Sequence, residues 1–135
     1  MRLALVTLLL LFGCSDSNDT ENEPDFYRVK YIVDSSTIHS GGQIDVTIDD
    51  PTFWEEELVF NIEYNERLEV TVGTYYRGDS PNLRAVAITD TFNQLYLVAE
   101  IYVAKNSRGP FVLKEINESD EPRDSVSLSY TILFD

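Results

Sequence analysis

Apolar and polar residues alternate along most of the chain, and this period of two is the feature that most constrains the fold. Near the C-terminus, residues 126–134 place Val, Leu, Tyr, Ile and Phe at every second position, with Ser or Thr at most positions between them. Successive side chains of a β-strand point to opposite faces, so this pattern predicts a half-buried strand. Beyond the first residues, no segment repeats apolar side chains at helical spacing over several turns. The chain is therefore expected to be all-β.

Turn-forming residues separate several segments with this alternation or with a continuous apolar run. The predicted strands cover residues 27–33, 43–48, 58–64, 68–72 with an optional extension to 76, 83–89, 95–104, 111–116 and 126–134. Short strands at even spacing indicate a two-sheet sandwich or a small barrel. We predict a single immunoglobulin-like antiparallel β-sandwich of seven to eight strands. Residues 95–104 are nearly apolar on both faces, so this strand is expected to lie centrally with both sides covered.

The N-terminal residues have the pattern of an export signal. Arg2 precedes an apolar run over residues 3–12, which is shorter than the roughly 20 residues that cross a bilayer as a helix. Leu-Phe-Gly-Cys at residues 11–14 resembles the lipobox of bacterial lipoprotein precursors. The resemblance implies cleavage before Cys14 and acyl chains on its sulfur and on the new amine. The alternatives are an ordinary signal or a short buried helix, but Cys14 is the only Cys in the chain.

Three regions follow from this interpretation: a signal peptide at 1–13, an acylated Cys14 with an acidic flexible tether at 14–25, and the sandwich at 26–135. The tether has no apolar residue after Cys14, so it cannot pack into a core. By resemblance to lipoproteins of Gram-negative bacteria, Ser15 after the Cys implies the outer membrane. The acidic stretch resembles an export signal for the cell surface or is a plain spacer, so the periplasmic and surface faces both stay open.

Charge and composition exclude several classes of function. The chain has 10 Lys and Arg against 24 Asp and Glu, a net charge of −14, which argues against nucleic acid as a partner because such binding rests on clustered cations. One Cys excludes an internal disulfide, and one His excludes a metal site built from several His residues. We expect a monomer without a cofactor. Its expected partners are the membrane, through Cys14, and an envelope protein or glycan.

Catalytic and metal-binding motifs are weak. His39 is the only His, and it lies beside Ser40 in a predicted loop where a solvated turn residue explains it better than a nucleophile's base. Asp49 and Asp50, followed by acidic residues 55–57, place oxygen ligands of the kind that Ca²⁺ prefers in one loop. Charged loops are usually only solvated, so we name Asp49 and Asp50 as a weak calcium candidate and assign no other metal ligand.

Aromatic pairs near predicted turns are the candidate binding residues. Phe53 and Trp54 follow one predicted turn, and Tyr75 and Tyr76 precede another. Exposed rings stack on sugars or anchor protein partners. The alternative is that these rings close the open ends of the sandwich.

Antiparallel connections predict which loops share an end of the domain, because turns then alternate between the two ends. The end with both termini should carry residues 49–57, 77–82 and 105–110. The other end should carry residues 34–42, 65–66, 90–94 and 117–124. A partner in the surrounding medium is expected to meet the second end, and a partner embedded in the membrane the first.

Short β patterns at residues 26–33, 100–103 and 127–131 are similar to those of small bacterial lipoproteins related to the mycobacterial small membrane proteins. That family consists of single β-sandwich domains that accompany large exporters of lipids and siderophores. We interpret the chain as a non-catalytic, lipid-anchored outer-membrane protein that acts as a binding or accessory module. The resemblance implies, as an alternative, an accessory subunit of an envelope exporter. A small hydrolase using carboxylates or His39 is a further alternative.

Overall fold

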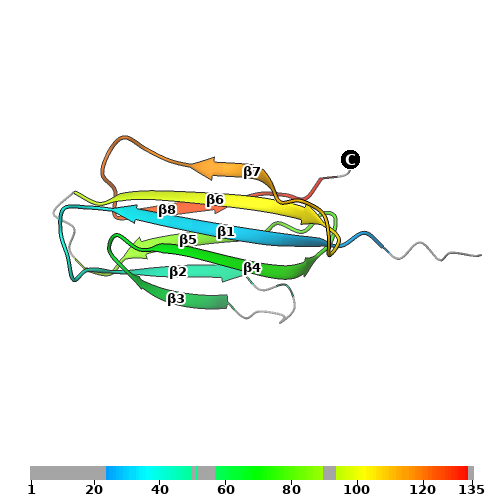
Figure 1. Ribbon diagram of the computed structural model, residues 1–135, viewed down its shortest axis with the longest axis horizontal. Coiled ribbons are helices and arrows are strands. Elements are labelled where there is room, and N and C mark those ends of the chain that lie inside the picture. The colour runs from blue at the N-terminus through cyan, green and yellow to red at the C-terminus, as the bar shows by residue number, and fades with distance from the viewer. Residues whose placement is uncertain (1–23, 50, 52–56, 90–93, 134–135) are drawn as a thin grey trace, which may run out of the picture.

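A computed structural model of the protein describes residues 24–49, 51, 57–89 and 94–133. These residues form eight β-strands in two antiparallel sheets of four strands each (Figure 1). No helix occurs among them. The predicted all-β antiparallel sandwich of seven to eight strands is confirmed.

The strands lie close to the predicted segments. They are β1 (Tyr27–Ser36), β2 (Gln43–Asp49), β3 (Glu57–Glu63), β4 (Arg67–Tyr75), β5 (Asn82–Ala87), β6 (Tyr96–Lys105), β7 (Val112–Asn117) and β8 (Ser125–Ser129). The prediction for the last strand was too long, because β8 ends at Ser129. Beyond it, the amides of Tyr130 and Ile132 donate to the carbonyls of Pro81 and Asp79, at 3.1 and 2.9 Å. This segment therefore pairs with the β4–β5 connection, although Ile132 still points into the core.

The strand order is β4-β1-β6-β7 in the first sheet and β3-β2-β5-β8 in the second. Every neighbouring pair is antiparallel. Only the β2–β3 and β6–β7 connections stay within one sheet, so β1 and β2 lie in different layers. The other connections cross between the layers, which ties both sheets into one core.

The core forms from the alternate positions that the sequence predicted. Val29, Tyr31 and Val33 of β1 are buried, and so are Ile44, Val46 and Ile48 of β2. Burial of one such side chain contributes about 1.5–3 kcal/mol relative to its exposure. The inward residues of β5 and β6 belong to the same cluster, namely Leu83, Ala85, Leu97, Ala99, Ile101 and Val103.

Strand β6 lies between β1 and β7, as its apolar composition predicted. Its outer face, however, is covered only in part: Val98 and Tyr102 are half-buried and Tyr96 is exposed. Neighbouring side chains of the same sheet contribute to this partial cover, as Lys30 Nζ lies 5.0 Å from the centre of the Tyr102 ring. No further layer of the described structure lies over this face. The expectation that both sides of this strand are covered is corrected accordingly.

The connections alternate between two ends of the sandwich (Figure 1). We name the N-terminal end by residues 24–26, 76–81, 106–111 and 130–133. We name the distal end by residues 34–42, 63–67, 87–89, 94–96 and 117–125. The antiparallel pairing of all strands confirms the predicted division for the described parts of the loops, whereas residues 50, 52–56 and 90–93 lie outside the described residues. The chain therefore enters and leaves the described sandwich at the same end.

Candidate functional site

At the N-terminal end, Asp25 fixes the point where the preceding chain leaves the sandwich. Its carboxylate forms ion pairs with Lys105 Nζ at 2.7 Å and with an Arg77 nitrogen at 3.3 Å. Arg77 also donates to the hydroxyl of Tyr27 at 3.3 Å. The hydrogen bond to Asp25 is the largest cause that raises the pKa of Lys105 above its ordinary value. Asp25, two residues before β1, is thus held by one cation at the end of β6 and one in the β4–β5 connection.

The turn between β6 and β7 closes over the same end. The Asn106 amide donates to the Phe26 carbonyl at 2.8 Å. Arg28 Nε donates to the Asn106 carbonyl at 3.0 Å, and its guanidinium lies 5.0 Å from the centre of the Phe111 ring. Asn106 has a φ of 57°, a left-handed conformation that Asn tolerates better than most residues. These contacts hold the start of β1 in one place.

The four aromatic candidates have different positions. Phe53 and Trp54 lie outside the described residues. Tyr75 is buried, and its hydroxyl donates to the Asp49 carbonyl at 2.7 Å. Tyr76 is 49% exposed, because neighbouring positions at the end of a strand face opposite sides. Within the described residues, only Tyr76 of this set offers a ring to a partner, whereas Tyr75 closes the sandwich from inside.

The calcium candidate is described only in part, because Asp50 and residues 55–56 lie outside the described residues. Asp49 is half-buried, and its carboxylate accepts a hydrogen bond from the Asn82 side-chain amide. Burial, and then the charge of Glu57, raise the pKa of Asp49 above its ordinary value, while the hydrogen bond from Asn82 opposes this shift. Where the structure is described, no group of three or more His, Cys, Asp and Glu side chains is placed to hold a metal ion. Calcium binding stays a prediction.

At the distal end, Asn65 joins the loop after β1 to the turn between β3 and β4. Its amide donates to Ser35 Oγ at 3.0 Å, and its side-chain oxygen accepts from the Thr37 amide at 2.8 Å. Its side-chain nitrogen donates to the His39 carbonyl at 3.3 Å. Asn65 has a φ of 66°, which suits a tight turn. His39 thus takes part in this loop through its backbone.

Arg123 holds the loop after β7 in a similar way. Its guanidinium donates to the Leu97 carbonyl and to both the side-chain and backbone oxygens of Asn117, the last two at 2.7 and 2.8 Å. The Asn117 side chain in turn donates to the Ser127 carbonyl at 2.9 Å. Arg123 therefore supplies hydrogen-bond donors to backbone carbonyls of the fold. The bond from Asn117 of β7 to Ser127 of β8 joins the two sheets.

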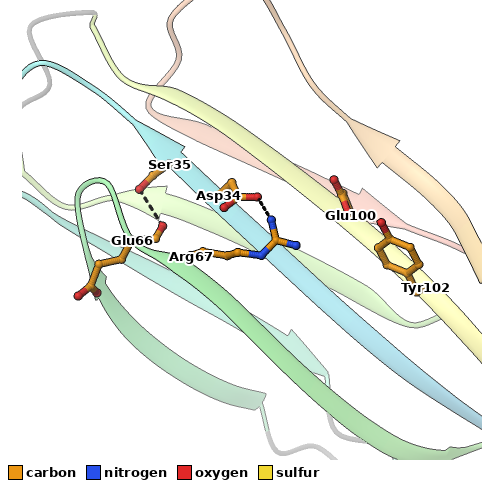
Figure 2. Close-up of polar contacts among 6 residues, drawn as sticks. All are labelled: Asp34, Ser35, Glu66, Arg67, Glu100 and Tyr102. Atoms are coloured by element: carbon orange, nitrogen blue, oxygen red, sulfur yellow. Dashed lines mark hydrogen bonds and ion pairs between the residues drawn. The ribbon is translucent and has the colours of Figure 1, made fainter. Parts of the chain in front are cut away.

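Polar groups of the first sheet, at and near the distal end, are paired by one ion pair and by hydrogen bonds (Figure 2). Arg67 of β4 reaches across to Asp34 of β1, with 2.5 Å between nitrogen and oxygen. Ser35 Oγ donates to the Glu66 carbonyl at 3.2 Å. Farther along the sheet, the Tyr102 hydroxyl donates to Glu100 at 2.7 Å. This hydrogen bond is the largest cause that raises the pKa of Tyr102.

Three large apolar side chains are exposed at the distal end, two in its connections and Tyr96 at the start of β6. Ile38 is 85% exposed, Ile88 54% and Tyr96 40%. None of them was singled out from the sequence, because an apolar residue in a loop or at the start of a strand has no periodic pattern that shows its direction. The nearest signal was the presence of Ile38 between polar residues of a loop rich in Ser, Thr and Gly.

Cys14, the predicted acylation site, lies outside the described residues. The part of the chain that the structure covers contains no helix with the length and hydrophobicity needed to cross a membrane. No known protein family, curated protein or solved structure matches the chain.

Proposed function

We propose that the protein is a non-catalytic binding module, held at the outer membrane by acyl chains on Cys14, that presents its distal end to a partner. The observation that carries this proposal is the position of Asp25 between Lys105 and Arg77. It fixes the exit of the preceding chain at one end of the sandwich. An anchor attached to that chain leaves the opposite end free.

The lengths of the tether and of the sandwich are consistent with an anchor at one end and a free distal end. The tether after Cys14 reaches at most on the order of 35 Å when extended. Strand β6 has 10 residues, or about 33 Å at ~3.3 Å per residue. The distal loops can therefore stand well beyond the lipid headgroups. More than one acyl chain is needed for stable anchoring, because each buried CH₂ contributes only about 0.8 kcal/mol.

Metabolic labelling with an alkyne analogue of palmitate tests the anchor. We expect the full chain to incorporate the label and to lose it in Cys14→Ser. A matched variant that combines Cys14→Ser with Ser15→Cys keeps one thiol but moves it by one residue, and should also remain unlabelled. Incorporation into this shifted variant, or a native protein whose mass shows a free thiol and an intact leader, would contradict the anchor.

The non-catalytic character is tested separately with the purified protein and isolated envelope glycans. We expect no conversion. Turnover that His39→Ala or a carboxylate substitution abolishes would establish the hydrolase alternative instead.

A further inference from the structure

We propose that the distal end of the sandwich is a docking surface for a basic, partly apolar segment of another protein. This inference rests on the proposed role as a binding module and names the surface and the chemistry of its partner.

The apolar part of this surface consists of Ile38, Ile88 and Tyr96. Backbone pairing places these positions at the same end of the sandwich: Ser36 pairs with Tyr96 across β1 and β6, and Ile38 follows Ser36 by two positions. The Ile88 amide donates to the Gln43 carbonyl at 3.0 Å, where β2 begins after the loop that contains Ile38. Exposed apolar surface with a polar rim marks interaction sites on soluble domains.

The described parts of the loops beside these residues are held in place by hydrogen bonds. Asn65 fixes residues 37–39, and Thr89 Oγ1 accepts from the Gln43 amide at 3.2 Å. The Thr89 carbonyl accepts from the Tyr64 hydroxyl at 2.7 Å. A surface that is ordered before binding loses less conformational entropy when a partner docks.

The described residues of the distal end carry a negative net charge. Their exposed carboxylates are Glu63, Glu66, Glu118, Asp120, Glu121 and Asp124. Among the described residues of this end, the Lys or Arg side chains are Arg67, which pairs with Asp34, and Arg123, which binds carbonyl and amide oxygens. Both positive groups are used within the fold. An apolar partner with Lys or Arg around its contact residues therefore complements this surface, whereas a second copy of the acidic chain is repelled.

Photo-crosslinking in intact cells tests the location. A photoreactive phenylalanine is placed in the full chain at Ile38 or Ile88, with Val59, 62% exposed on β3 of the second sheet, as the matched control. We expect an adduct with one protein from both distal positions and none from Val59. Mass spectrometry should place the adduct in a segment that contains Lys or Arg beside apolar residues. An equal adduct at Val59, an acidic segment, a glycan adduct or a self-adduct would overturn the proposal.

A defined probe tests the chemistry. A phage-displayed library of random short peptides is selected on the purified full chain, and one enriched peptide is synthesised. We expect enrichment of sequences with Lys or Arg beside apolar residues. Combined Ile38→Ser and Ile88→Ser should weaken binding of the peptide about tenfold, as loss of a central contact does. Glu121→Lys should weaken it more than Glu115→Lys, which changes the same charge on β7.

Other results of this selection would overturn the docking surface: enrichment without basic residues, or equal binding to the variants and to Val59→Ser. The two proposals fail separately. A labelled Cys14 without distal adducts leaves the anchor and removes the docking surface. A basic segment crosslinked to a protein whose Cys14 carries no label leaves the docking surface and removes the anchor.

Discussion

The hydroxyl groups of Tyr31 and Tyr75 lie 2.7 Å apart in the core of the sandwich. Tyr75 also donates to the Asp49 carbonyl at 2.7 Å, so Tyr31 is the donor in the bond between the two rings. Tyr31 and Tyr75 belong to β1 and β4 of the first sheet, and Asp49 ends β2 of the second. The chain of hydrogen bonds therefore ties the two sheets together at the N-terminal end.

Removal of the Tyr75 hydroxyl is expected to destabilise the fold more than removal of the Tyr31 hydroxyl. Tyr75→Phe eliminates both hydrogen bonds and should lower the free energy of unfolding by about 1–3 kcal/mol. Tyr31→Phe leaves the bond from Tyr75 to Asp49 and should cost about 1 kcal/mol. Urea unfolding measures both. Tyr76→Phe, at the exposed neighbouring position, should stay within about 0.5 kcal/mol, and a larger loss there than at Tyr75 would contradict this assignment.

Arg123 is expected to stabilise the distal end through its bonds to Leu97 and Asn117. Arg123→Ala leaves these acceptors without their charged donor and should lower the free energy of unfolding by about 1.5–3 kcal/mol. Hydrogen exchange should accelerate at the Arg123 and Ala87 amides, which bond the Leu95 and Asp124 carbonyls. Arg84→Ala, at an exposed position of β5, is the matched control. An equal effect of both substitutions would refute the role of Arg123.

Gly42 is expected to tolerate no side chain, because a Cβ atom there would overlap the ring of Tyr64. The amide of Tyr64 donates to the Gly42 carbonyl at 2.9 Å, which holds the ring close to the backbone. Gly42→Ala should cost about 1–3 kcal/mol of stability through overpacking. The double variant that combines Gly42→Ala with Tyr64→Ala should lose less stability than the sum of the losses in the two single variants. Additive losses would show that the ring is not what excludes the side chain.

Asp49 gives the stability of the protein a defined pH dependence. Its pKa in the folded protein is raised from the ordinary value of 3.8, mainly by burial. The stability it contributes is full below that value and is lost as the pH rises through its folded pKa. Asp49→Asn keeps an acceptor for Asn82 but cannot ionise, so it should be more stable than the native chain at neutral pH.

Thermal unfolding over a pH series checks this expectation. The advantage of Asp49→Asn should shrink as the pH falls toward and below 3.8. Glu57→Gln removes the like charge that contributes to the raised pKa, and should give a smaller advantage in the same direction. A difference between Asp49→Asn and the native chain that is independent of pH would contradict the prediction.

The limits of sequence reasoning are clearest at Tyr75 and Tyr76. Both rings were candidates for binding because both lie near a predicted turn. The buried pairing of Tyr75 with Tyr31 depends on a residue 44 positions away, and no local pattern contains that information. The exposed side chains of Ile38 and Ile88 were missed for the same reason, since loop conformation is set by contacts with Asn65 and Gln43.

The sequence alone determined the strands, their inward faces and the division of the loops between two ends, since alternation and turn residues are local properties. The tertiary structure decided which strands pair, where β8 stops and how Asp25, Asn65 and Arg123 are bound. Pairing between distant strands depends on the summed packing and hydrogen bonding of the whole core. Such long-range terms are not encoded in the residues next to any one position.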